Sequence, residues 1–280
     1  MLVPKYGDSE GSDMTLTRQE MPAIPAEARR IFREGKWTQR TTGLCVGYTN
    51  AAVAILPRDL AFDFLLYCQR NPKPCPLLEV LDPGDPMVMS LAGGADIRTD
   101  VAGYRVTVRG EVVDEPSDIL QYWREDLVTF LMGCSGTFES ALEGAGIVPR
   151  WRQGEESGSG IYRSNIPTVP AGRFSGPLVV TMRPIPNHQV SRAVQVSSRF
   201  PGHHGAPIHI GDPAAIGIDD LSKSEWAAGP KILPGEVPVF WACGVTLQTV
   251  VEESKPDLMI THLPGRMFIT DIPSEQQAVM

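Results

Sequence analysis

The spacing of apolar and polar residues along the chain predicts four helices. They span 25–33, 57–69, 137–144 and 246–254. The first has Pro25 in its opening turn, where a missing backbone N–H is tolerated. The second carries an apolar stripe at helical spacing, formed by Leu60, Phe64 and either Tyr67 or Cys68. We expect it to end at Asn71, because the residue before a proline avoids the helical region.

Strands are predicted where apolar residues alternate with polar ones or run without interruption. The segments are 77–81, 104–108, 177–182, 237–242 and 267–270. The run at 177–182 is continuous and stops at Arg183-Pro184, as expected of a buried strand. Because helices and strands are mixed along the chain, we expect a layered α/β architecture.

Composition narrows the class of protein. The 280 residues carry a formal net charge of −8, which argues against nucleic acid or an anionic membrane as the main partner. A site for a small acid needs only one or two local arginines. The five cysteines are odd in number and form no CxxC pair, which favours a reducing, cytoplasmic location. No long apolar run or secretory leader is seen, and the polar, glycine-rich segment 150–160 is expected to be a surface loop.

Two polar segments in the first half could bind a ligand. Three prolines stiffen residues 71–76, so this loop could present Asn71, or it could be a rigid connector between a helix and a strand. Arg98 lies between Asp96 and Asp100. Its planar guanidinium could clamp a carboxylate, or it could be the centre of a structural ion-pair network.

A turn before the predicted helix 137–144 contains Cys134 and Ser135. The free N–H groups of a helix N-terminus attract anions and lower the pKa of a thiol placed there. Either side chain could therefore be a nucleophile, or the turn could hold a substrate carboxylate. The alternative is that Cys134 is an inert core cysteine.

The segment 203–213 holds three of the five histidines. His204, His209 and Asp212 could act as metal ligands or as general acid and base, or each histidine could be structural. A strand through 208–210 would place His209 on the face opposite its neighbours. Further on, Cys243, Gly244 and Thr246 form a strand-to-helix turn, and His262 follows in a Thr-His-Leu-Pro-Gly motif.

Taken in order, these motifs resemble the hydro-lyase family whose domain also occurs in D-glutamate cyclases. The matching stretches are FDFLLYCQRNPKPCPLLEV, DIRTD, DLVTFLMGCS, AGRFSGPLVVTMRP, HGAPIHIGDPAAIGI, EVPVFWACGVT and ITHLPG. The resemblance covers about residues 25–271. It implies a three-layer α/β/α part formed by 21–115 and 235–272. A smaller two-layer α+β part, 116–234, would be inserted between them, with tails at 1–20 (disordered) and 273–280.

The resemblance also implies an activity, the conversion of D-glutamate to 5-oxo-D-proline and water, with no cofactor. Such a reaction needs a base, a proton for the leaving oxygen and a cationic clamp for the second carboxylate. His204 or His209 would move the proton, Arg98 or Arg183 would be the clamp, and the turn after Gly133 would hold the oxyanion. A homo-oligomer is expected on general grounds only.

The chain departs from the family pattern at four positions. Asn50 stands in place of a glutamine, Ala52 in place of an asparagine, Gly136 in place of an aromatic residue, and Arg266 in place of a histidine. These changes leave two alternatives to a lyase open. One is a metal-dependent hydrolase that uses His204, His209 and Asp212. The other is a non-catalytic protein that binds a small acid.

Overall fold

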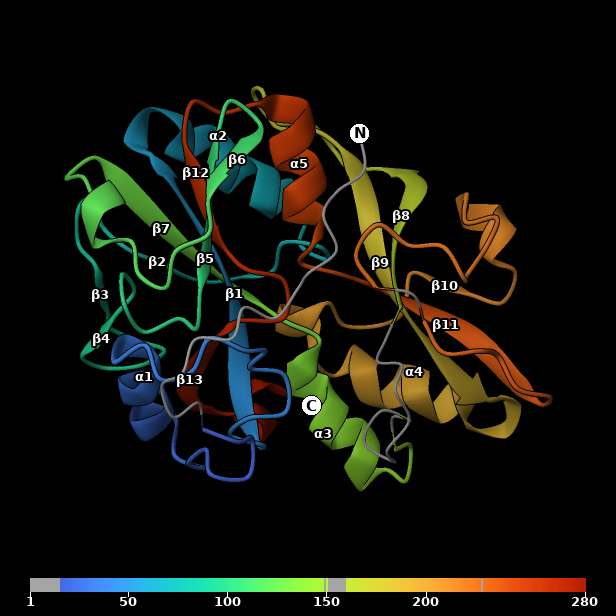
Figure 1. Cartoon of the computed structure of the whole chain (residues 1–280). Helices are drawn as coiled ribbons and strands as arrows, with labels where there is room; N and C mark the ends of the chain where they lie inside the picture. Colours follow the sequence, from blue (N-terminus) through green and yellow to red (C-terminus); the bar gives the residue numbers. More distant parts are fainter. Residues whose placement is uncertain (1–15, 149, 151–159, 228) are drawn as a thin grey trace.

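The computed structural model describes residues 16–148, 150, 160–227 and 229–280 (Figure 1). Within them, helices are mixed with antiparallel strands, which agrees with the prediction of a protein with both helices and sheets. The helices are α1 (Pro25–Arg33), α2 (Arg58–Arg70), α3 (Gly136–Gly144), α4 (Val190–Ser198) and α5 (Thr246–Ser254). The 3-10 turns are η1 (Leu120–Tyr122), η3 (Asn187–Gln189), η4 (Pro201–His203), η5 (Pro213–Ile216) and η6 (Ser274–Gln277).

Seven antiparallel strands form the larger sheet. They are β1 (Tyr48–Pro57), β2 (Leu77–Val80), β5 (Tyr104–Val108), β6 (Glu111–Asp114), β7 (Leu127–Gly133), β12 (Met259–His262) and β13 (Phe268–Pro273). Their order is β2-β7-β1-β12-β5-β6, and β13 also pairs with β1. Nine of the ten residues of β1 are buried, so this strand is the centre of the molecule. Two short strands, β3 (Met87–Val88) and β4 (Ala95–Asp96), pair separately beside it.

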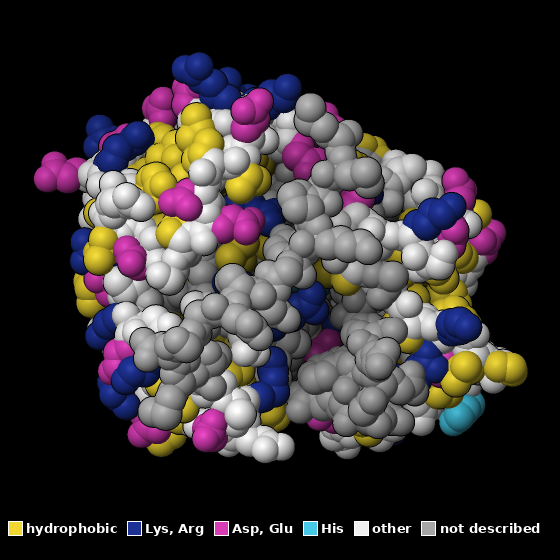
Figure 2. All heavy atoms as spheres, viewed as in Figure 1, with side chains coloured by type: hydrophobic (Ala, Val, Ile, Leu, Met, Phe, Trp, Pro, Cys, Tyr) yellow, Lys and Arg dark blue, Asp and Glu magenta, His cyan; other side chains and the backbone are white. Residues whose placement is uncertain are grey.

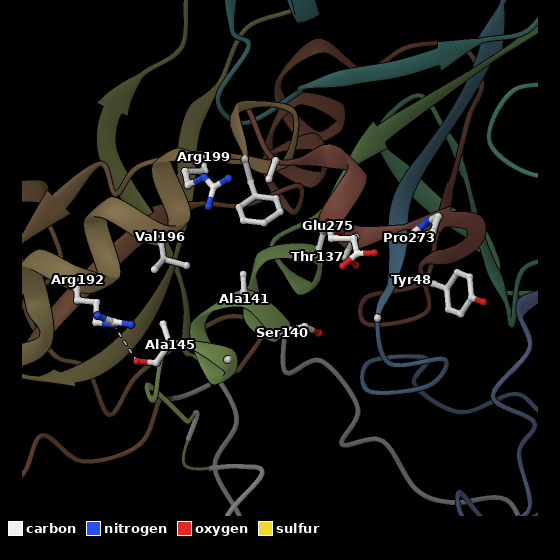
Figure 3. A pocket seen from close by; sticks show the side chains of 15 residues that line it. Tyr48, Thr137, Ser140, Ala141, Ala145, Arg192, Val196, Arg199, Pro273 and Glu275 are labelled. Atoms are coloured by element: carbon white, nitrogen blue, oxygen red, sulfur yellow. Dashed lines mark hydrogen bonds between the residues drawn. The ribbon is translucent and has the colours of Figure 1, made fainter. Parts of the chain in front are cut away.

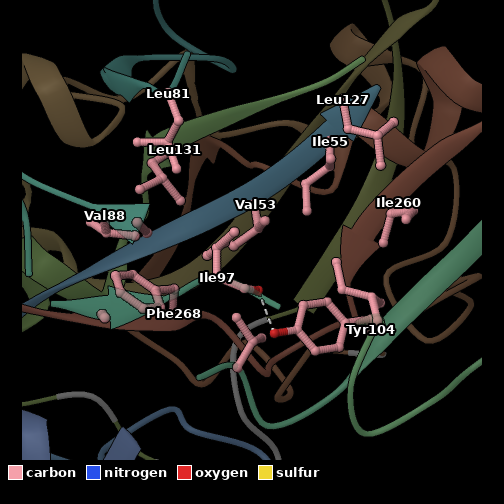
Figure 4. Packing of buried hydrophobic residues seen from close by; sticks show 14 of the residues in the cluster. Val53, Ile55, Leu81, Val88, Ile97, Tyr104, Leu127, Leu131, Ile260 and Phe268 are labelled. Carbon is pink, nitrogen blue, oxygen red and sulfur yellow. Dashed lines mark hydrogen bonds between the residues drawn. The ribbon is translucent and has the colours of Figure 1, made fainter. Parts of the chain in front are cut away.

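The alternation of side chains along β1 divides the core of the larger sheet. Ala52, Ala54 and Leu56 pack with apolar residues of α2 and α5 on one face. Val53 and Ile55 point to the other face, where they meet a cluster that includes Tyr104 and Phe268 (Figure 4). The hydroxyl of Tyr104 donates a hydrogen bond of 2.6 Å to the Ile97 carbonyl, which satisfies its buried polar end. Both faces of the sheet are thus covered.

Four strands form the smaller sheet, in the order β10-β11-β9-β8. They are β8 (Gly160–Pro167), β9 (Pro177–Pro186), β10 (His209–Ile210) and β11 (Glu236–Ala242). Helices α3 and α4 cover one face, where Val239 and Trp241 point. Phe240 and Met182 point to the other face, against the segment around η5.

The division of the chain into a three-layer and a two-layer part stays a prediction, but the strands can be compared with its boundaries. β7 lies in the larger sheet although 116–234 was assigned to the smaller part, and β11 lies in the smaller sheet although 235–272 was assigned to the larger. Most of the predicted tail 1–20 and loop 150–160 lies outside the described residues. The predicted tail 273–280 forms η6, and its Val279 N–H donates to the Arg199 carbonyl at 2.7 Å.

The surface in the orientation of Figure 2 has Asp and Glu side chains interspersed with Lys and Arg side chains over its described residues. In the described part of the chain, every helix is too short or too polar to cross a bilayer.

Candidate active site

The turn from β7 into α3 lies at the junction of the two sheets and is the centre of the candidate site. Its first residue, Gly133, pairs with Ala51 of the central strand and packs directly against η4. A Cβ atom on Gly133 would lie 1.8 Å from the Gly202 carbonyl oxygen and 2.6 Å from Nδ1 of His203. Glycine is therefore required at this close approach. It brings segments about 70 residues apart in the chain together around Cys134 and Ser135.

Arg183, on β9, is the buried cation of this site. Its Nε donates to Oε1 of Glu139 at 3.0 Å, and its Nη2 donates to the same oxygen and to Oγ of Ser135, the latter at 3.2 Å. The guanidinium carbon also lies 5.5 Å from the ring centroid of Phe138 and 5.4 Å from that of Trp241. Nη1 is buried and has no hydrogen-bond partner. A buried guanidinium N–H without an acceptor is costly, and a bound carboxylate would satisfy it.

The two cysteines of the site are protonated thiols. Burial raises the pKa of Cys134, and it raises the pKa of Cys243 to about 12. The expectation that the helix N-terminus lowers the pKa of Cys134 is therefore wrong. The N–H of Gly136 does act in that direction, but the loss of solvation outweighs it.

Two neighbouring histidines are held in different ways. His203 accepts a hydrogen bond at Nδ1 from the Cys134 N–H (3.2 Å), so its Nε2–H donates to Oε1 of Gln277 (3.3 Å). His204, in a left-handed backbone conformation, donates from Nδ1 to the Lys73 carbonyl at 2.6 Å. Its Nε2 is then left as an acceptor. Burial is the main cause that lowers the pKa of each to about 4, so both rings are neutral at pH 7.

Several predicted residues have structural partners near this junction. Both polar atoms of the Asn71 side chain bond to the backbone of Val169 at 2.8 Å, as in the connector interpretation. Thr246 accepts from the Val179 N–H and donates to the Cys243 carbonyl. His262 accepts at Nδ1 from the Val53 N–H, and burial lowers its pKa to about 4. Gly244 lies against Ala52 of β1.

Arg98 does not converge on this site. Its guanidinium is bonded to Asp96, with the closest contact at 2.7 Å, and lies 5.8 Å from the ring centroid of Trp123. Asp96 belongs to β4, which is far from β9 (Figure 1), and Trp123 packs against the core cluster of the larger sheet that includes Tyr104. The structural ion-pair interpretation therefore describes its geometry.

His209 and Asp212 are also separated from Arg183. His209 pairs with Phe240, whose side chain is on the face of the smaller sheet opposite Val239. Arg183 pairs with Val239, so its side chain is on the other face from that of His209. The ring of His209 donates to the Asp212 backbone carbonyl at 2.7 Å, and the Asp212 carboxylate caps η5. Among the described residues, no group of three His, Cys, Asp or Glu side chains could hold a metal ion.

Three residues of the site were not among the predicted ones, although each left some signal. Glu139 is buried and is the partner of Arg183; a buried arginine within an apolar strand requires such a counter-ion. His203, directly before the predicted His204, accepts from the Cys134 N–H and donates to Gln277. Asn50 was noted only as a departure, yet its Oδ1 is buried without a partner and its amide lies near Gly136. Arg266, another departure, donates to the Ala102 carbonyl at 3.5 Å.

A cavity of about 770 Å³ opens on the outer side of α3 (Figure 3). It lies between α3, α4 and residues 273–278, and Arg192 and Arg199 lie at its edge. Arg192 donates to the Ala145 carbonyl at 2.9 Å. None of the residues predicted from the sequence as catalytic or substrate-binding lines this cavity.

Comparison with known proteins agrees with the motifs. A protein of Geobacillus kaustophilus named "Putative hydro-lyase" is 54% identical over 92% of this chain and 98% of its own length. One of Bacillus subtilis, also named "Putative hydro-lyase", is 51% identical over 91% of this chain and 99% of its own. The sequence profile described as D-glutamate cyclase matches residues 128–271. The chain therefore belongs to the D-glutamate cyclase family.

Proposed function

We propose that this chain is a hydro-lyase that acts on a small amino or hydroxy acid, with D-glutamate converted to 5-oxo-D-proline and water as the reaction. Membership of the family and the names of the relatives support the class of reaction. The observation on which the proposal depends is the unpartnered Nη1 of the buried Arg183. It is a ready donor for a substrate carboxylate at the junction of the two sheets.

The reaction balances without a cofactor. The amine nitrogen of D-glutamate attacks its own side-chain carboxyl carbon, a C–N bond forms, and a C–O bond of that carboxyl breaks. The ammonium loses two protons in forming the lactam, and these leave with the departing oxygen as water. The other carboxylate is unchanged. The protein must therefore bind one carboxylate, orient the amine and stabilise the developing oxyanion.

Arg183 is the proposed clamp, because Nε and Nη2 are held by Glu139 and Ser135 and only Nη1 remains for the substrate. The first turn of α3 has backbone N–H groups without helical acceptors, and we assign the oxyanion to it. Cys134, with its raised pKa, is a neutral thiol at this place.

His204 is the proposed proton-handling group, with Nε2 as its available atom. Its pKa of about 4 makes it a weak base toward an ammonium group, since each pKa unit of mismatch costs about 1.4 kcal/mol. We therefore assign it the role of a neutral acceptor that receives a proton transiently. The metal-dependent alternative is not proposed, because among the described residues no group of three His, Cys, Asp or Glu side chains could hold a metal ion.

In this proposal the larger sheet is the core of a three-layer part and the smaller sheet that of a two-layer part, with β7 in the former and β11 in the latter, unlike the predicted boundaries. The substrate would bind where β7, β9 and the β11–α5 turn meet. This arrangement explains why residues from both halves of the chain surround Arg183.

The test is incubation of the purified chain with D-glutamate, with loss of one water followed by mass spectrometry. Arg183→Lys keeps the positive charge but removes the free Nη1. We expect kcat/KM to fall about 10- to 100-fold, the value of a hydrogen bond to a charged group. Arg163→Lys is the matched control, since Arg163 pairs with Glu225 and Glu252 on the exposed edge of the same sheet.

The outcomes are distinguishable. If the wild-type chain forms product and Arg183→Lys has the same kcat/KM, Arg183 does not bind the substrate. Stabilisation of the fold by D-glutamate without any product would support the non-catalytic alternative, a protein that binds a small acid. Melting temperatures of both variants separate loss of function from loss of fold.

A further inference from the structure

The cavity between α3, α4 and residues 273–278 has no part in the proposed reaction. Its volume of about 770 Å³ is within the range of about 300–1,000 Å³ that is usual for small-molecule sites. Arg183 and its two partners, Glu139 and Ser135, are not among the residues that line it. The cavity and the proposed carboxylate clamp are therefore different places.

Two arginines of α4 join the walls of this cavity. Nε of Arg192 donates to the Ala145 carbonyl oxygen, at the end of α3, over 2.9 Å (Figure 3). Nε of Arg199 donates to the Val279 carbonyl oxygen at 3.1 Å, and the Val279 N–H donates to the Arg199 carbonyl oxygen at 2.7 Å. Three segments that are distant in the chain are thus bonded to one another, so the cavity is formed by the fold itself.

Both guanidinium groups are held by Nε alone. In the described part of the chain, the side chains of Arg192 and Arg199 have no other hydrogen bond and no ion pair. They are seven residues apart on α4, with Val196 between them, and lie at the edge of the cavity (Figure 3). The Nη N–H groups of a guanidinium form a planar fork that matches a carboxylate or a phosphate. This edge of the cavity is therefore suited to an anion.

The space next to these arginines is apolar. Ala141 of α3 and Val196 and Phe200 of α4 line it. The acidic residue of the lining, Glu275, lies with Pro273 on the side away from α4 (Figure 3). It repels an anion from that side. An anionic head group is thus directed to α4, and an apolar surface is available beside it.

We propose that this cavity is a second ligand site, which binds an amphipathic organic anion. The carboxylate or phosphate head group binds the Nη groups of Arg192 and Arg199, and the apolar body covers Ala141, Val196 and Phe200. D-glutamate does not have this chemistry, because it carries a charged group at each end and has almost no apolar body. The ligand therefore belongs to a different class from the proposed substrate.

The first experiment measures the binding of four probes to the wild-type chain by titration calorimetry: octanoate, octyl phosphate, 1-octanol and acetate. We expect 1-octanol to bind about 10- to 100-fold more weakly than octanoate, since it lacks the charge-assisted hydrogen bonds. Acetate should bind at least about 100-fold more weakly, because each buried CH₂ group contributes about 0.8 kcal/mol. The tighter of the two long-chain anions identifies the head group. Equal affinities for octanoate and 1-octanol, or no binding of either anion, would overturn the proposal.

The second experiment locates the bound anion. Arg192→Gln and Arg199→Gln should each weaken octanoate about tenfold or more and leave 1-octanol unchanged. Arg70→Gln is the matched control, because Arg70 is also exposed and also donates to a backbone carbonyl, that of Pro170, but lies on α2. Octanoate affinity that is unchanged in both α4 variants would overturn the site.

Arg183→Lys separates this cavity from the proposed substrate site. It should bind octanoate as the wild-type chain does. Octanoate binding that is lost in Arg183→Lys and kept in Arg192→Gln would place the acid at the carboxylate clamp and overturn the second site.

A variant that leaves every charge in place decides the matter if an arginine variant fails to fold. Ala141→Leu extends a side chain into the cavity, and we expect it to weaken octanoate and 1-octanol alike by about tenfold or more. Ala61→Leu, at a partly buried position of α2, is its matched control. Melting temperatures show which variants are folded. Octanoate affinity that is the same in Ala141→Leu and in Ala61→Leu would exclude binding in this cavity.

Discussion

Arg183 and Arg98 show at the scale of single residues what a sequence can and cannot reveal. Both arginines are next to apolar segments, and both were candidates for a carboxylate clamp. Arg98 is paired with a carboxylate two residues away, which the Asp-Ile-Arg motif already indicated. The partner of Arg183 is 44 residues away, on α3. Only the fold shows that one of its nitrogens is left without an acceptor.

The cysteine of the β7–α3 turn yields a prediction at the same scale. Because burial raises the pKa of Cys134, only a small fraction of the thiol is ionised at pH 8, and the thiolate is the form that is alkylated. We expect the native chain to react with iodoacetamide at least about tenfold more slowly than the urea-unfolded chain. Peptide mass spectrometry identifies the labelled position. Rapid labelling of Cys134 in the native chain would contradict this and revive the nucleophile hypothesis.

At the scale of elements, the sequence predicted those with a clear period or clear ends. α1, α5 and β5 have the predicted bounds, and β9 starts as predicted but continues to Pro186. The central strand β1 was missed. It contains three alanines and is buried on both faces, so it shows neither alternation nor a strongly apolar run. What defines β1 as a strand is its pairing with β7, β12 and β13, which are distant in the sequence.

The close contact between β7 and η4 gives a prediction for an element. Gly133→Ala would press a methyl group against the Gly202 carbonyl and the ring of His203, and backbone at this place cannot move without disturbing β1. We expect a loss of about 1–3 kcal/mol or more in the free energy of unfolding. Urea titration measures it.

Gly144→Ala, in α3, is the matched control for Gly133→Ala. No atom lies within 4 Å of the added methyl group. In a helix, alanine is favoured over glycine by about 0.5–1 kcal/mol. The two substitutions should therefore change stability in opposite directions. Equal effects would show that the contact with η4 is not tight in solution.

At the scale of the whole molecule, the site is made where two sheets meet, and this junction could not be predicted from the sequence. The motifs were correctly placed at turns, but turns occur on every side of the molecule. Arg98, which follows β4, and His209, at the start of the short strand β10, are both away from Arg183, the second on the opposite face of the smaller sheet. Cys134, Ser135 and His204 are near it because β7, β9 and η4 come together. Whether a predicted residue lies near Arg183 or away from it depends on the order of the strands in the sheets. Local sequence patterns carry no information about that order.

The junction also determines how the whole fold responds to acid. His203, His204 and His262 are buried as neutral rings, and burial lowers the pKa of each to about 4. In the unfolded chain the same groups have a pKa near 6.5, so on acidification the unfolded state takes up protons first. Their contribution to stability is complete above pH 6.5 and is lost as the pH falls toward 4.

We therefore expect the free energy of unfolding to fall between pH 7.5 and pH 5 by about 2 kcal/mol per buried histidine. Urea titrations across this range measure it. His262→Asn retains an acceptor for the Val53 N–H but cannot titrate, so its profile should be flatter by roughly a third. A wild-type urea midpoint that stays constant from pH 7.5 to 5 would mean that these rings take up protons within the folded state. In that case the histidines are solvated, and the junction between the sheets is open to water.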